Sequence, residues 1–102
     1  MKRGEPLHQA ERGWTLLTSH GRILLMIARD PAIRIRDIAA GAEVTERTAQ
    51  GIVADLRQAG YITQEKVGRR NAYTISLNQP FRHAAESGHT VGELVALFQG
   101  EG

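Results

Sequence analysis

The sequence contains no cysteine, only 5% aromatic residues and three prolines among its 102 residues. Without cysteine there is no disulfide framework, no thiolate metal site and no cysteine nucleophile. The longest apolar run, Ile23 to Ala28, has six residues, far fewer than the roughly 20 that a membrane helix needs. No secretory signal is recognisable either. These absences predict a cytoplasmic protein with no membrane partner.

The net charge is small, with 13 Lys and Arg against 11 Asp and Glu, but the charges are unevenly distributed. Residues 34–70 contain seven basic and five acidic side chains, whereas residues 71–102 contain one basic and three acidic ones. This distribution is compatible with a nucleic-acid partner, and equally with ordinary solvated surfaces. The length predicts a single hydrophobic core.

Apolar residues that recur at helical spacing predict the first helix. Thr18 or Ser19 can cap its N-terminus, and the helix runs to about Arg29 because the residue before Pro31 is disfavoured in helical geometry. The alternation at residues 33–35 predicts a very short strand after it.

Two further helices are expected before Gly60. The first covers about residues 36–40, and Gly41 is a natural stop for it. The second covers residues 45–59, with Thr45 as its cap. The inward-facing residues expected on the three helices are Ile23, Leu24, Ile27, Ile38, Ala39, Ala49, Ile52, Val53 and Leu56.

After Gly60 the apolar pattern changes to the two-residue period of strands. Residues 61–67 and 71–77 are predicted to pair as a hairpin around Gly68-Arg69-Arg70, which gives the hairpin a basic tip. Residues 81–88 are expected to form a loop or an irregular helix.

The spacing of Thr90 and Glu93 is that of a capping box, which predicts a last helix that ends at Gly100.

The predicted order of helix, short strand, helix, turn, helix and hairpin matches a winged helix-turn-helix. Residues 14–77 resemble winged helix-turn-helix transcriptional regulators of the ArsR/MarR-like type. The resemblance rests on residues 35–40, 44–50, 52–56, 60–62 and 68–73. It implies a mainly α fold with a small antiparallel β-hairpin.

The resemblance also implies a sequence-specific regulator that binds double-stranded DNA. Helix 45–59 would lie in the major groove, and the hairpin 61–77 on the flanking backbone or in the minor groove. In the major groove, arginine can pair with guanine, and glutamine can pair with adenine. The expected DNA contacts are Thr45, Glu46, Arg47, Thr48, Gln50, Gly51, Lys66, Arg69, Arg70 and Asn71.

Two points of this interpretation stay open. Gly51 stands where many similar proteins have a basic residue, which removes a contact or lets the helix backbone approach DNA closely. Winged helices also occur as protein-interaction modules that do not bind DNA. If DNA is the partner, we expect a repressor, because the sequence shows no additional domain that could recruit polymerase.

The chain is expected to divide into a flexible arm (1–13), a winged helix-turn-helix (14–77) and a C-terminal loop and helix (78–102). The last segment is expected to form a homodimer, since its helix is more apolar than a short terminal helix needs to be. The alternative is that this helix simply covers the first one. The expected dimer contacts are Trp14, Leu17, Leu94, Val95, Leu97 and Phe98.

A metal or cofactor site has little support. His83, Glu86 and His89 are spaced by three residues and could ligate zinc or nickel, but Gly88 interrupts the segment. We expect no cofactor, and the sequence does not indicate a small-molecule effector.

Catalysis is not expected either, because no nucleophile elbow or phosphate-binding loop is present. Asp37 and Asp55 are predicted to form surface ion pairs with Arg36 and Arg57 rather than to act as catalytic acids. The two histidines His8 and His20 are isolated in the sequence and suggest no site.

Overall fold

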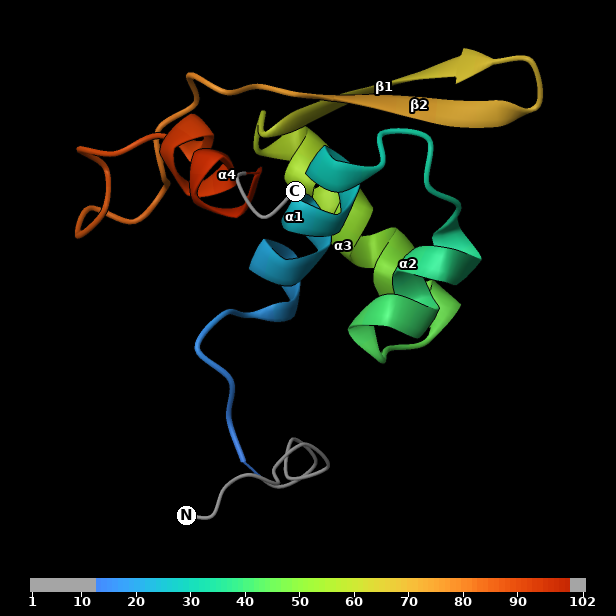
Figure 1. Cartoon of the computed structure of the whole chain (residues 1–102), viewed down its shortest axis with the longest axis horizontal. Coiled ribbons are helices and arrows are strands. Elements are labelled where there is room, and N and C mark those ends of the chain that lie inside the picture. The colour runs from blue at the N-terminus through green and yellow to red at the C-terminus, as the bar shows by residue number, and fades with distance from the viewer. Residues whose placement is uncertain (1–12, 100–102) are drawn as a thin grey trace.

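The computed structural model describes residues 13–99, in which four helices and one two-stranded antiparallel sheet are found (Figure 1). The elements are α1 (Ser19–Arg29), α2 (Ile35–Ala42), α3 (Glu46–Gln58), β1 (Ile62–Val67), β2 (Arg70–Ile75) and α4 (Val91–Gln99). The predicted arm, apart from Gly13, and the predicted helix stop at Gly100 lie outside the described residues. The predicted mainly α fold with a small antiparallel hairpin is confirmed.

Helix α1 begins and ends as its sequence predicts. The Thr18 Oγ1 accepts a hydrogen bond from the Gly21 N–H at 3.2 Å, and Asp30 is the C-terminal cap before Pro31. The apolar stripe of α1 is buried, and its members are Ile23, Leu24 and Ile27.

The predicted strand at residues 33–35 is wrong. The Ile33 N–H donates to the Asp30 carbonyl at 3.0 Å, which closes a turn. Arg34 has extended dihedrals because it is the N-terminal cap of α2, and the next residue is already helical. Three alternating residues therefore reflect a turn followed by a helix cap.

Helix α2 continues through Gly41, so the predicted stop at this glycine is also wrong. The helix ends instead at Ala42, and its C-terminal cap, Glu43, adopts the left-handed conformation with φ 60°. A Cβ atom on Gly41 would lie 2.5 Å from the Met26 Cε of α1. A side chain at this position would therefore displace the end of the Met26 side chain.

Helix α3 is the longest helix of the described region, and it confirms its prediction. The Thr45 Oγ1 accepts from the Thr48 N–H at 3.0 Å, and the chain leaves the helix through Gly60, whose φ is 84°. The buried face of α3 consists of Ala49, Ile52, Val53 and Leu56, as expected.

The hairpin is confirmed, with a tighter turn than predicted. Strand pairing runs from Ile62–Ile75 to Val67–Arg70, which leaves Gly68 and Arg69 as a two-residue turn. Figure 1 shows the hairpin projecting away from the helices, with its tip beyond the chain that joins α1 to α2.

One core joins α1, α2, α3, the base of the hairpin and α4, and Ile62, Tyr73, Val91 and Val95 are its members outside the first three helices. Residues 81–88 form a loop of turns, closed by a bridge between Pro80 and Thr90. In the described region, none of the helices has the length and apolar character needed to cross a bilayer.

The carboxylate of Glu93 lies at the start of α4. It accepts hydrogen bonds from the His89 ring at 2.6 Å and from the Thr90 N–H at 3.3 Å, and these bonds lower the pKa of Glu93. The carboxylate half of the predicted capping box is therefore present.

Candidate nucleic-acid interface

The exposed face of α3 is the first part of the candidate site. Helix α3 packs against α1 and α2 through its buried face, and this fixes which side chains point to solvent. Arg47, Gln50 and Gly51 are all exposed, and Ala54 is half-buried. Because a helix repeats every 3.6 residues, Arg47, Gly51 and Ala54 lie along one line opposite the core. The helix thus presents two long polar side chains beside a stretch of bare backbone.

The N-terminus of α3 carries Thr45, Glu46 and Thr48, all exposed. The Thr45 hydroxyl oxygen already accepts the Thr48 N–H as the helix cap, and its own O–H remains able to donate. Backbone N–H groups and the helix dipole favour an anion at such a terminus. The Glu46 carboxylate in the first turn opposes a second negative charge.

The tip of the hairpin is the second part of the site, and its basic residues are held differently. Lys66 and Arg69 are exposed. Arg70 is exposed as well, but one of its terminal nitrogens donates to the Ala32 carbonyl at 2.6 Å. This bond ties the hairpin to the connection between α1 and α2.

Asn71 lies half-buried beside Tyr73 rather than at the tip. Burial raises the pKa of the Tyr73 hydroxyl, while a hydrogen bond with the Asn71 side chain and the charge of Arg57 act in the opposite direction. The Asn71 side chain therefore lies on the same face of β2 as Tyr73.

Two further hydrogen bonds hold the hairpin relative to the helices. Arg57 near the end of α3 donates to the Gln64 Oε1 of β1 at 2.8 Å, and the Tyr73 N–H of β2 donates to the Pro31 carbonyl at 2.9 Å. Together with Arg70, they set the direction of the hairpin with respect to α3.

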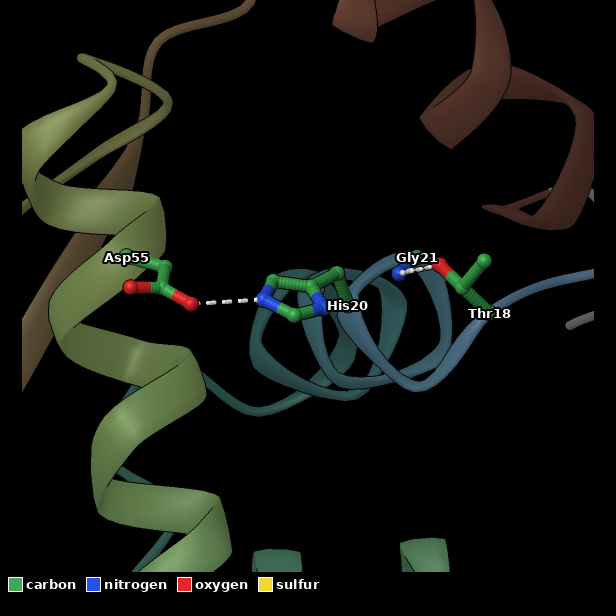
Figure 2. A network of polar contacts seen from close by, with 4 residues as sticks. All are labelled: Thr18, His20, Gly21 and Asp55. Atoms are coloured by element: carbon green, nitrogen blue, oxygen red, sulfur yellow. Dashed lines mark hydrogen bonds and ion pairs between the residues drawn. The ribbon is translucent and has the colours of Figure 1, made fainter.

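The structure also pairs two residues that the sequence does not connect (Figure 2). The His20 Nε2 of α1 lies 2.8 Å from the Asp55 Oδ2 of α3, and both side chains are about half-exposed. The predicted pair of Asp55 with Arg57 is wrong, because residues two apart on a helix point in different directions. No local pattern could reveal a contact across 35 positions.

The second predicted pair, Asp37 with Arg36, is absent as well: among the described residues, the ion pairs are His20–Asp55 and His89–Glu93. A shallow hollow of about 410 Å³ lies next to the first pair, with Gln58, Tyr61 and Arg82 on its walls.

The histidines of the C-terminal loop are engaged separately. The His83 Nδ1 accepts from the Ala85 N–H at 3.0 Å, and His89 pairs with Glu93. Within residues 13–99, no three metal-ligating side chains come together.

The apolar residues of the C-terminal helix divide between the core and the surface. Val95 is buried in the core of this chain, Leu94 is half-buried, and Leu97 and Phe98 are 72% and 41% exposed. An open groove of about 980 Å³ lies beside them, lined among others by Leu17, Leu25, Met26, Ile33, Val95 and Phe98. Trp14 is 85% exposed.

Comparisons with known proteins agree with this architecture. The family model described as MarR family matches residues 14–70, more than half of the chain. The structure is similar to that of MepR, a transcription regulator of the Staphylococcus aureus multidrug efflux pump MepA, with a TM-score of 0.54 and 16% identity. This match covers 91% of the present chain and 62% of MepR, so the chain spans less than two thirds of that protein. No curated protein sequence matches the chain. The chain belongs to the MarR family of winged-helix transcription regulators.

Proposed function

We propose that the chain binds double-stranded DNA sequence-specifically and represses transcription by occupying a promoter site. The observation that carries the proposal is the exposed face of α3, where Arg47 and Gln50 project from a helix whose other face is fixed in the core. A helix has the diameter that the major groove accepts. The description of MepR as a transcription regulator supports the same role.

In this proposal α3 reads the bases. Arg47 can donate two hydrogen bonds to guanine, and Gln50 can pair with the edge of adenine. Thr45 and Thr48 lie at the end of the helix where phosphate is favoured, so they position the helix on the backbone.

The hairpin adds contacts that do not depend on sequence. Lys66 and Arg69 are the exposed cations of its tip, and Arg70 retains further N–H donors beyond the one bound to Ala32. These groups fit the flanking phosphates or the adjacent minor groove, whose negative potential attracts arginine.

A second copy of the chain completes the proposal, since one winged helix reads only a short half-site. The residues available to a second copy are Trp14, Leu17, Leu94, Leu97 and Phe98, of which Leu17 and Phe98 line the groove between α1 and α4. Light scattering at micromolar concentration tests this part: a dimer is expected, and a clean monomer contradicts it.

A mobility-shift assay at two salt concentrations, with random-sequence competitor DNA, tests DNA binding itself. We expect a retained complex that weakens as salt rises, because bound cations displace counterions from the phosphates. A variant with both Arg69→Ala and Arg70→Ala is compared with the wild type in the same assay. It should bind every duplex more weakly. If the wild type retains no duplex at low salt, the protein-interaction alternative replaces the proposal.

A further inference from the structure

Helix α3 contains a glycine near its middle, on the face proposed to meet DNA. Gly51 is exposed and lies between the capped N-terminus of α3 and its end at Gln58. A glycine inside a helix is destabilising relative to alanine, because it loses more backbone freedom on folding. The position therefore needs a reason.

No such reason lies within the described part of the chain. A Cβ atom on Gly51 would meet no atom within 4 Å. Two other helical glycines contrast with it: a Cβ on Gly41 would lie 2.5 Å from the Met26 Cε, and a Cβ on Gly92 would lie 2.8 Å from the Leu77 carbonyl oxygen. The Leu77 backbone leaves no room for a side chain at Gly92, and a side chain at Gly41 would displace the end of Met26, whereas the space beside Gly51 is open.

The neighbours of Gly51 show what that open space adjoins. Arg47 lies one turn earlier on the same line of the helix, Gln50 is adjacent to that line, and Ala54 follows about one turn later. At Gly51 the surface of α3 therefore consists of helix backbone without a side chain. The long polar side chains next to it extend beyond that backbone. Such a surface allows a partner to approach the helix axis at Gly51, while Arg47 and Gln50 reach the partner from the N-terminal side of the glycine.

We propose that duplex DNA contacts the α3 backbone at Gly51, and that the missing Cβ sets how deeply α3 lies in the major groove. At that depth, Arg47 and Gln50 reach the base edges. The inference rests on the proposed DNA binding and adds to it the position of closest approach. It also explains why a helix that reads bases has a residue that weakens it.

The test is Gly51→Ala, measured for both stability and DNA affinity. Because the space is open, the alanine should stabilise the helix and raise Tm by about 4–8 °C. The added methyl group should hold α3 away from the bases. The affinity should fall about 5- to 150-fold, the value of one good base contact. The probe is the duplex that the wild type enriches from a random-sequence library.

Stability and affinity moving in opposite directions is the result that a purely structural role for Gly51 does not give. Gly88→Ala is the matched control, because this exposed loop glycine also has no atom within 4 Å of an added Cβ. It should leave affinity unchanged. Gly51→Ser repeats the test with a second small side chain.

An affinity of Gly51→Ala equal to or above that of the wild type overturns the inference and leaves DNA binding intact. A lower Tm for Gly51→Ala also overturns it, because the glycine would then serve the fold. If the wild type enriches no duplex at all, the proposed function fails, and this inference fails with it.

Discussion

The two elements proposed to contact DNA are held to the domain in different ways. Helix α3 buries four side chains, Ala49, Ile52, Val53 and Leu56, between itself and the rest of the core. The hairpin buries only Ile62 and Tyr73, both toward its base, and β1 is exposed over the rest of its length. An isolated hairpin is only marginally stable in water, so this one depends on its attachment to the helices.

This difference suits two kinds of contact. Reading bases requires side chains held within a fraction of an ångström, which a helix fixed by a packed core provides. Contact with phosphates tolerates more variation, because the backbone has the same charge at every position. The rigid element therefore carries Arg47 and Gln50, and the projecting element carries Lys66 and Arg69.

The largest expected effect is a difference in unfolding free energy between a variant of α3 and a variant of the hairpin. Ile52→Ala removes a buried side chain of α3 and should cost about 2–5 kcal/mol of unfolding free energy, through lost burial and the cavity left behind. Val67→Ala at the exposed end of β1 should change it by less than about 0.5 kcal/mol. Urea unfolding of both variants measures this difference. Similar losses in the two would show that the hairpin contributes to the core as much as α3 does.

The next effect separates the elements by what they do to DNA binding. Arg47→Ala and Gln50→Ala should each remove about 1–3 kcal/mol of discrimination between bases and leave the salt dependence almost unchanged. Arg69→Ala and Arg70→Ala should weaken binding to all sequences, and each should reduce the slope of log affinity against log salt by about 1. Selection from random duplexes and salt titration of one duplex measure the two quantities.

A different outcome would contradict each of these two predictions. If the Arg47 and Gln50 variants enrich the same motif as the wild type, these residues do not read bases. If the salt slope is unchanged in the variant that lacks both Arg69 and Arg70, the hairpin does not contact phosphates.

The helices could be predicted from the sequence because their signals are local. Thr45 caps α3, and Ile52 and Leu56 recur at helical spacing, so both the start and the buried face followed from neighbouring residues. The glycines were harder. Gly60 ends a helix as expected, whereas Gly41 lies within one, at a position where an added Cβ would displace the end of the Met26 side chain.

Contacts between distant residues could not be predicted in the same way. The His20–Asp55 pair spans 35 positions, and the bond from Arg70 to the Ala32 carbonyl spans 38. No spacing rule applies to such pairs, since they exist only once the helices have packed. The sequence therefore indicated candidate interface residues, and the structure showed that Arg70 also donates to a carbonyl within the chain.

The smallest effect separates the two arginines of the tip. Arg70→Ala removes the bond to the Ala32 carbonyl, worth about 0.5–1.5 kcal/mol, whereas Arg69→Ala removes a side chain from the turn. Loss of the bond should loosen the hairpin where the Tyr73 N–H donates to the Pro31 carbonyl. Exchange of the Tyr73 amide hydrogen should then be about 2- to 10-fold faster in Arg70→Ala, because local opening becomes easier. Arg69→Ala is the control and should keep the wild-type rate. Equal rates in the two variants would show that the hairpin is held by its buried base alone, and both arginines would then be free to contact DNA.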